Sequence, residues 1–339
     1  MTEPIRLLVA DPATSRFGQR VRNAPAVRAF RLLLAENETP EALLAAAPEA
    51  EAILCYQANV TSRLIQAAPA LKLIQKQGLN CKNIDVAAAT QRNVRVATRP
   101  LMRSITVAEH ALALLLACAR KIVPGHHAVT GAVYREMGLE PVVTSQPIYR
   151  GNWARIEGIS ELYQATTGIV GMGDIGMEIA RRCRAFGMPV VYYQRTPHPP
   201  AAEASLGIRY LPLDDLLAAS DYVVLVIPHT PESEGLIGAR ELALMKPSAT
   251  LVNVGRGGLV DEEALAVALR DRRIAMAGLD VYRTEPLPAA SPLIGLPNVV
   301  LLPHLGGGSH RGWDIDIPAA LQNIQRYFED GRADGIVNA

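Results

Sequence analysis

The chain has 339 residues, a length that suits two domains better than one. Hydrophobic residues make up 49% of the sequence, which is ample for two cores, and the formal net charge is +1. A net charge so close to zero gives no field that would attract nucleic acid or an anionic membrane. These two classes of partner are therefore not expected.

The cysteines and the apolar runs indicate the compartment. The chain contains four cysteines, none of them in a C-x-x-C motif: Cys55, Cys81, Cys118 and Cys183. Scattered thiols of this kind are typical of reduced cysteines in the cytosol. Residues 5–10 predict a strand and show no signal-peptide pattern. The longest apolar run, residues 111–119, is too short to span a bilayer. We therefore expect a cytoplasmic protein.

Short apolar strands alternate with helical stretches over the first hundred residues. The predicted strands cover residues 5–10, 52–56, 73–75 and 94–97. The predicted helices cover residues 39–47, 62–67 and 84–92. Alternation of this kind indicates an α/β domain with a parallel sheet.

The middle of the chain predicts a buried helix and then a long loop. Residues 106–121 are apolar nearly all round, which suits a helix between domains. Residues 123–163 contain several helix breakers, including Pro124, Pro141 and Gly151, and predict irregular structure. A loop this long in a compact protein is usually functional or part of an interface.

A second alternation of strands and helices follows the loop. Its predicted strands cover residues 168–170, 189–193, 222–226, 250–253, 275–280 and 299–302, and a last helix covers residues 317–328. Strands and helices in this number are typical of a complete doubly wound nucleotide-binding domain.

Residues 167–176 predict a buried strand that turns through a G-x-G-x-x-G motif into a helix over residues 177–185. Gly171 allows the tight turn, Gly173 lets the backbone approach a pyrophosphate, and Gly176 lets helix and strand pack closely. The N–H groups at the start of the helix would face the phosphates, where the helix dipole favours negative charge. The motif in this context predicts dinucleotide binding.

The end of the next strand indicates which dinucleotide is bound. Gln194, Arg195 and Thr196 lie roughly 20 residues past the glycines, where an NAD-binding domain usually has Asp or Glu for the ribose hydroxyls. Without a carboxylate there, a 2′-phosphate is not repelled, and Arg195 can hold it by a bidentate contact. Thr196 can add a hydroxyl donor. The sequence therefore favours NADP(H); NAD(H) stays open if Arg195 faces solvent and Gln194 bonds the ribose weakly.

Three later segments each place polar side chains just after a predicted strand. Arg256 follows the strand at 250–253, Glu285 comes shortly after the strand at 275–280, and His304 follows the strand at 299–302. In doubly wound folds, ligands bind at the carboxyl ends of the strands. These segments are therefore candidates for the catalytic groups.

Together with the glycine motif, these segments resemble the D-isomer-specific 2-hydroxyacid dehydrogenase family. Residues 78–85, GLNCKNID, are similar to the family's substrate-carboxylate loop, and residues 107–110, VAEH, resemble the start of its interdomain helix. The resemblance covers nearly the whole chain and is weakest in residues 1–50 and 123–160.

The resemblance implies an α/β fold of two doubly wound parallel-sheet domains. A flavodoxin-like substrate domain would comprise residues 1–102 plus 311–339. A Rossmann dinucleotide-binding domain would comprise residues 103–310. The family is usually dimeric, so a homodimer that meets through the long loop is expected.

By the same resemblance, Arg256 would bind the substrate carboxylate and polarise its keto oxygen, because a guanidinium fork matches a carboxylate. His304 would be the general acid in ketoacid reduction and the base in alcohol oxidation, since a free imidazole titrates near ~6.5. Glu285 would bond the other ring nitrogen of His304 and orient it. The hydride would pass between the nicotinamide and substrate C2.

The resemblance also implies contacts for each ligand. The cofactor contacts would be Gly171, Gly173, Asp174, Ile175, Gly176, Gln194, Arg195, Thr196, Pro228, Thr230, Val254, Asp280 and Gly306. Asp174 would turn to solvent or cap the helix, and Asp280 would accept from the carboxamide. Leu79 and Asn80 would donate backbone N–H groups to the substrate carboxylate, beside Arg256. The Asn80 side chain would touch the substrate or stabilise a tight turn.

The main interpretation is an NADPH-preferring 2-ketoacid reductase, such as a glyoxylate or hydroxypyruvate reductase. A relative that acts on another small anion, such as phosphite, keeps the same Arg, Glu and His set and stays open. Formate dehydrogenases of this superfamily have Gln at the Glu285 position, so Glu285 argues against that activity. A cofactor-sensing corepressor that binds peptides is an alternative from another class. The histidines show no metal-ligand spacing, so no metal is expected.

Overall fold

The computed structural model describes residues 3–35, 39–308 and 312–338. These form two compact units, one of Met1–Ile105 with Ser309–Ala339 and one of Thr106–Gly308. The helix α5 (Met102–Ala119) starts in the first unit and continues into the second. Both units are parallel-sheet α/β folds, so the predicted fold class is confirmed.

The first unit contains a five-stranded parallel sheet in the order β2-β1-β3-β4-β5, the flavodoxin-like order. Its strands are β1 (Ile5–Val9), β2 (Phe30–Leu34), β3 (Ala52–Cys55), β4 (Leu73–Gln77) and β5 (Arg95–Arg99). Its helices are α1 (Arg16–Asn23), α2 (Pro40–Ala46), α3 (Ser62–Ala67), α4 (Val86–Gln91) and α12 (Gly312–Asp330), with the 3₁₀ turn η1 (Pro25–Ala29). Leu8 and Ile53 belong to one core cluster of this unit, and Leu7 and Leu54 belong to the other. The sheet is therefore covered on both faces, as parallel sheets require.

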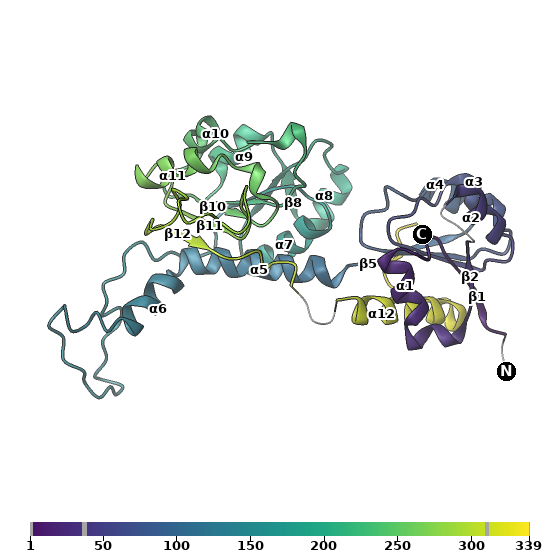
Figure 1. The fold of residues 1–339 in the computed structure, drawn as a ribbon, viewed down its shortest axis with the longest axis horizontal. Coiled ribbons are helices and arrows are strands. Elements are labelled where there is room, and N and C mark those ends of the chain that lie inside the picture. The colour runs from purple at the N-terminus through teal and green to yellow at the C-terminus, as the bar shows by residue number, and fades with distance from the viewer. Residues whose placement is uncertain (1–2, 36–38, 309–311, 339) are drawn as a thin grey trace. The chain divides into compact units, whose positions relative to one another are not determined.

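The segment 334–338 lies along β5, which is the last strand of this sheet (Figure 1). The Thr98 N–H donates to the Gly335 carbonyl at 2.8 Å, and the Val337 N–H donates to the Val96 carbonyl at 2.9 Å. The Asn338 side chain accepts from the Val96 N–H at 2.6 Å. This segment is therefore fixed to β5 by main-chain and side-chain bonds.

The second unit contains a seven-stranded parallel sheet in the order β12-β11-β10-β9-β6-β7-β8. Its strands are β6 (Thr167–Val170), β7 (Val190–Tyr193), β8 (Ile208–Tyr210), β9 (Tyr222–Leu225), β10 (Thr250–Asn253), β11 (Met276–Leu279) and β12 (Val299–Leu301). Its helices besides α5 are α6 (Ile122–Thr130), α7 (Asp174–Ala185), α8 (Pro200–Leu206), α9 (Leu213–Ala219), α10 (Ala239–Leu244) and α11 (Glu262–Arg270), with the 3₁₀ turns η2 (Pro231–Ser233) and η3 (Gly257–Leu259). The strand order reverses between β6 and β9, as in a Rossmann dinucleotide-binding sheet.

Within the described part of the chain, α5 is the helix that is long and apolar enough to cross a membrane by composition. Half of that window is buried inside the protein. Leu114, Leu115 and Cys118 of α5 are fully buried in the core of the second unit. The apolar side chains of α5 therefore form part of the hydrophobic core of the second unit.

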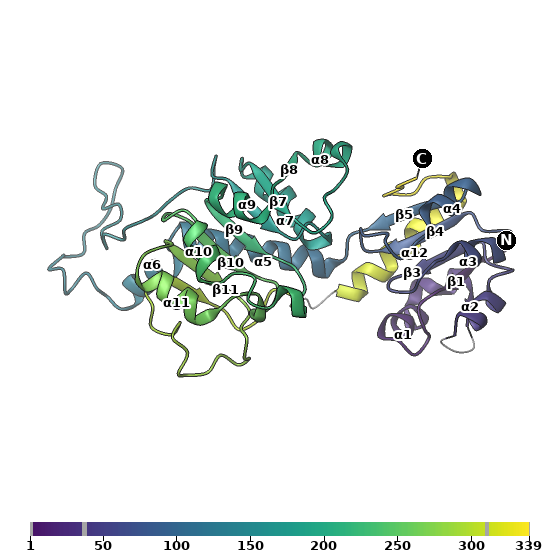
Figure 2. The same cartoon turned by 90° about the horizontal axis from the view of Figure 1, so that it is seen from above.

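The prediction of irregular structure over residues 123–163 was wrong at its start, where α6 forms. Pro124 lies in the first turn of α6, a position that proline tolerates because its missing N–H has no helical partner there. Beyond α6 the chain forms an extended arm, residues 131–163, that reaches away from the sheet of its own unit and returns at Leu162, which packs into the core (Figure 2). Val143 and Tyr149 of this arm are 92% and 77% exposed.

Candidate active site

The glycine motif forms the turn between β6 and α7. Gly171 has a positive φ of 107°, and a Cβ on it would lie 2.6 Å from Ile227 Cγ2. A Cβ on Gly176 would collide with the Gly171 carbonyl oxygen. Around Gly173, in contrast, no atom of the described residues lies within 4 Å of such a Cβ. Packing therefore requires the first and third glycines, whereas the second borders open space that a ligand can approach.

The start of α7 suits an anion. Its N-cap is Gly173, which makes no side-chain cap bond to this 12-residue helix. The N–H groups at the start of a helix attract phosphate, and a glycine at the N-cap leaves room for it. Asp174 is the first helical residue and is half-buried, so it does not occupy the cap position. Ile175 packs against the core beneath.

The predicted 2′-phosphate residues lie just beyond β7. Arg195 is exposed, and the Gln194 amide donates to the Thr196 carbonyl at 2.7 Å. The Thr230 hydroxyl bonds the Glu232 carboxylate and holds the pKa of that carboxyl below its ordinary value, with a smaller effect from the Arg195 charge. The charge of Arg195 therefore acts on the carboxylate that Thr230, another predicted cofactor contact, bonds. Pro228 precedes this group, and its carbonyl accepts from the Ser233 hydroxyl at 3.1 Å.

Three neighbouring strands bring the predicted catalytic side chains together. Arg256 follows β10, Glu285 follows β11 and His304 follows β12, and these strands are adjacent in the sheet. The three side chains share one hollow of about 480 Å³. Its lining residues are His229, Glu234, Arg256, Gly257, Gly258, Tyr282, Arg283, Glu285 and His304.

Glu285 and His304 form a direct pair. His304 Nδ1 lies 2.7 Å from Glu285 Oε2, which leaves Nε2 available to another partner. The other Glu285 oxygen accepts from the Tyr282 N–H at 3.1 Å. Burial raises the pKa of Glu285, but the bonds from His304 and Tyr282 and the charge of Arg256 outweigh it, so the net pKa is below its ordinary value. Glu285 is therefore held as a carboxylate behind the imidazole.

A buried asparagine that the sequence analysis missed fixes the loop of Arg256. Asn253 is 1% exposed. Its Oδ1 accepts from the Gly255 N–H at 3.0 Å, and its Nδ2 donates to the Arg256 carbonyl at 2.9 Å. Arg256 Nη1 in turn donates to the Gly255 carbonyl at 2.6 Å. The signal available in sequence was a polar residue ending an otherwise apolar strand.

His304 has a φ of 56°, in the left-handed region that non-glycine residues seldom adopt. Such a conformation costs roughly 1–3 kcal/mol and persists where the surroundings enforce it. The next two residues are held by Asp280, which is 1% exposed and accepts from the Leu305 and Gly306 N–H groups at 2.8 Å each. Val254, another predicted cofactor contact, is buried, and its N–H donates to Leu225.

The predicted substrate loop lies in the first unit, just after β4. Leu79 is half-buried and Asn80 is exposed. Asn80 Oδ1 accepts from the Lys82 N–H at 2.9 Å. Of the two roles considered for this side chain, the bond to Lys82 supports the tight turn.

The sequence analysis also missed a second histidine–carboxylate pair in the hollow of Arg256. His229 Nε2 bonds Glu234 Oε2, and Arg283 lies 3.1 Å from the other Glu234 oxygen. A Cβ on Gly258 would lie 2.7 Å from His229 Nε2. The His229–Glu234 pair therefore packs directly against Gly258, in the loop that carries Arg256.

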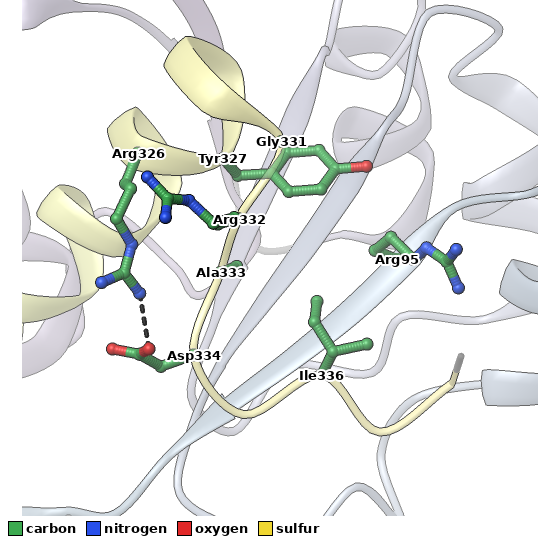
Figure 3. Close-up of a pocket in the computed structure, with 8 residues that line it drawn as sticks. All are labelled: Arg95, Arg326, Tyr327, Gly331, Arg332, Ala333, Asp334 and Ile336. Carbon is green, nitrogen blue, oxygen red and sulfur yellow. Dashed lines mark ion pairs between the residues drawn. The ribbon is translucent and has the colours of Figure 1, made fainter.

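A hollow of about 700 Å³ in the first unit is rich in arginine (Figure 3). Its charged lining residues are Arg95, Arg326, Arg332 and Asp334. Arg326 pairs with Asp334 at 2.7 Å, and Arg332 pairs with Asp330 at 2.7 Å. Arg95 donates to the Asn338 carbonyl at 2.8 Å. These contacts fix the chain after α12, so the arginines already serve the fold.

Known proteins with a similar sequence carry names consistent with this site. The profile of the D-isomer specific 2-hydroxyacid dehydrogenase family, NAD binding domain, matches residues 112–306. A glyoxylate/hydroxypyruvate reductase B from Yersinia pestis is 38% identical over 293 residues, which are 86% of this chain and 84% of that protein.

Two further similarities extend over different lengths. A D-3-phosphoglycerate dehydrogenase from Mycobacterium leprae is 40% identical over 274 residues, 80% of this chain. The match covers 48% of that protein, so the chain spans about half its length. The solved NADPH-dependent glyoxylate/hydroxypyruvate reductase of Sinorhizobium meliloti, in complex with NADP and malonate, is 28% identical with a TM-score of 0.54, over 99% of this chain and 97% of that one. The chain therefore belongs to the D-isomer-specific 2-hydroxyacid dehydrogenase family.

Proposed function

We propose that the protein transfers a hydride between a nicotinamide cofactor and a small 2-ketoacid or D-2-hydroxyacid. The observation that carries this proposal is the Glu285–His304 pair, with its 2.7 Å contact, in one hollow with Arg256. An acid–base imidazole beside a guanidinium matches the chemistry of an α-ketoacid. The names of the Yersinia and Sinorhizobium relatives support the same reaction class.

Each residue of the triad has a distinct task in this reaction. Arg256 binds the substrate carboxylate and polarises the keto oxygen through its guanidinium fork. His304 holds a proton at Nε2, gives it to the keto oxygen in reduction and takes it from the hydroxyl in oxidation. Glu285 accepts from Nδ1, which fixes the ring orientation and the tautomer that leaves Nε2 toward the substrate.

The second unit holds the dinucleotide in this proposal, and the nicotinamide supplies or accepts the hydride. The turn at Gly171, Gly173 and Gly176 with the start of α7, whose N-cap is a glycine, fits the pyrophosphate, together with Asp174 and Ile175. The remaining proposed contacts are Gln194, Arg195, Thr196, Pro228, Thr230, Val254, Asp280 and Gly306.

NADP(H) is the preferred cofactor in this proposal, ahead of NAD(H). The exposed Arg195 follows a strand end at which Gln194 replaces a carboxylate. A similar protein, the NADPH-dependent glyoxylate/hydroxypyruvate reductase of Sinorhizobium meliloti, was solved in complex with NADP. Both observations favour recognition of a 2′-phosphate.

We further propose that the first unit binds the substrate carboxylate through the backbone of Leu79 and Asn80. As a separate proposal, the two domains divide between residues 102 and 103 and between residues 310 and 311. The protein would act in the cytoplasm as a homodimer that meets through the arm at 131–163, whose exposed apolar side chains suit an interface.

The first test follows the nicotinamide absorbance band with NADPH and NADH separately, each with glyoxylate, hydroxypyruvate, pyruvate and phenylpyruvate. We expect turnover that is faster with NADPH, with at least one of the four ketoacids. Faster turnover with NADH would keep the dehydrogenase and discard the cofactor preference. Tight cofactor binding without turnover of any ketoacid would contradict the proposed reaction and favour another small anion or a cofactor-sensing protein.

A further inference from the structure

The catalytic loop after β12 is held from outside itself. His304 adopts a left-handed backbone conformation, and the two residues that follow donate their N–H groups to the two oxygens of Asp280, at 2.8 Å each. Asp280 is itself fixed by its N–H, which donates to the Asn253 carbonyl at 3.0 Å. The backbone position of His304 therefore depends on where the Asp280 carboxylate points.

The Asp280 carboxylate has a partner from another part of the chain. His110 of α5 places Nε2 3.0 Å from Asp280 Oδ1, and the two side chains are 15% and 2% exposed. A carboxylate buried this deeply must be stabilised by hydrogen bonds or a counter-charge. The Leu305 and Gly306 N–H groups supply hydrogen bonds, and His110 Nε2 adds a polar contact at ion-pair distance that lacks hydrogen-bond geometry.

The His110 ring also lies against the loop. A Cβ on Gly306 would lie 3.3 Å from His110 Cδ2 and 3.1 Å from Asp280 Oδ2. Gly306 therefore has room for both neighbours because it has no side chain. One imidazole contacts the carboxylate and the loop that the carboxylate holds.

We propose that His110 is a positioning residue for His304, acting through Asp280 and the 305–306 backbone. This inference rests on the proposed function and extends it to a residue of α5. His110 fixes the carboxylate, the carboxylate fixes two N–H groups, and these hold His304 in its left-handed conformation beside Glu285. Misplacement of a catalytic group by about 1 Å can cost on the order of 100-fold in rate.

Two substitutions separate the polar contact made by the His110 ring from the space that the ring fills. His110→Gln keeps a polar N–H group near the position of Nε2, whereas His110→Leu fills similar space with an apolar side chain. Glu109→Gln is the matched control, because Glu109 is the neighbouring residue on α5, is 62% exposed and pairs with Arg182. For each variant, kcat and KM for the ketoacid, the Kd for NADPH and the thermal unfolding temperature are measured.

We expect His110→Leu to lower kcat by roughly 10- to 100-fold, with a change in ketoacid KM of less than about threefold. His110→Gln should restore kcat to within about fivefold of the wild type, and Glu109→Gln should match the wild type. A merely structural role would lower the unfolding temperature of His110→Leu while folded enzyme kept its kcat. Unchanged kcat in His110→Leu, or an equal loss in His110→Gln, would overturn the inference.

The nitrogen-edited NMR signals of the His304 ring give a readout that does not need turnover. His110→Leu should move these signals, and His110→Gln should leave them near their wild-type positions. If the wild type reduces no ketoacid, the proposed function fails while the signals still test the positioning. If the wild type is active and the His304 signals stay in place in His110→Leu, the positioning alone fails.

Discussion

At the scale of single residues, the main feature of the candidate active site is the nitrogen of His304 that can carry the exchanged proton. Nδ1 of His304 is engaged by Glu285, so proton exchange with a substrate has to use Nε2. The backbone of His304 has a left-handed conformation, and strained conformations of this kind are found most often at functional sites.

Replacing His304 by Ala tests its role directly. We expect turnover to fall by roughly 10² to 10⁴, the range for lost general acid–base catalysis. The Kd for NADPH should stay within a few-fold of the wild type, because the glycine turn is untouched. Stopped-flow reduction of the ketoacid and fluorescence titration of NADPH give the two quantities. Undiminished turnover would remove His304 from the mechanism.

Glu285 gives a prediction on stability against pH. Its folded pKa is below the ordinary value, so its contribution is fully present above the unfolded pKa and is lost as pH falls through the folded one. Wild type should therefore exceed Glu285→Gln in urea midpoint at pH 7, and the difference should shrink below about pH 4. The effect should be modest because the Glu285 side chain is 36% exposed. A difference that grows on acidification would contradict this assignment.

Arg195→Ala tests the cofactor preference. The variant should bind NADPH much more weakly, by about 10-fold or more, and bind NADH almost as the wild type does, because only NADPH offers a 2′-phosphate. Fluorescence titrations with both nucleotides measure this. Arg209→Ala, at an exposed position on β8, is the control. Equal losses for both nucleotides would refute a contact between Arg195 and the 2′-phosphate.

At the scale of elements, the three glycines of one turn do different things, and a matched pair of substitutions separates them. Gly173→Ala meets no atom of the described residues within 4 Å, so the fold should tolerate it while NADPH binding weakens. Gly176→Ala pushes a methyl group into the Gly171 carbonyl and should destabilise the unit by roughly 1–3 kcal/mol. Thermal unfolding and NADPH titration read the two effects. Normal NADPH binding in Gly173→Ala would argue against a pyrophosphate at this turn.

The predicted elements were confirmed where an unbroken apolar run is buried on both faces of the sheet, as in β3 and β9. The sequence analysis missed β2 and β8, whose runs contain the exposed Arg31 and Arg209. It also missed α1, in which Phe17, Gly18 and Val21 form a buried face too short for a clear period. These elements depend on packing that the local sequence does not report.

The site shows the same limit. Arg256, Glu285 and His304 could be found because each follows a predicted strand, and β10, β11 and β12 are neighbours in sheet as well as in sequence. The contact of His110 with Asp280 could not be found from the sequence. The helix α5 precedes β11 by more than a hundred residues, and the packing of α5 on the sheet is a tertiary property.

At the scale of the whole molecule, the arm at 131–163 is where we expect two copies of the chain to meet. Val143 and Tyr149 are 92% and 77% exposed, so they add little to the stability of a single chain and would be buried at such an interface. Val143→Glu with Tyr149→Glu should convert the expected dimer to monomer in size-exclusion chromatography with light scattering. Val267→Glu is the control, because Val267 is 45% exposed on α11. A wild type that elutes as a monomer, or a double variant that stays dimeric, would contradict an interface at the arm.

The segment 334–338 covers the outer edge of β5, where another chain could otherwise pair with the sheet. A strand at the end of a sheet offers a row of unused amide and carbonyl groups, which recruit strands from other chains and start aggregation. On β5, the Val96 and Thr98 groups that face outward are already taken by Gly335, Val337 and Asn338. A foreign strand would first have to displace these bonds. This border of the sheet is therefore shielded against edge-to-edge polymerisation in a crowded solution.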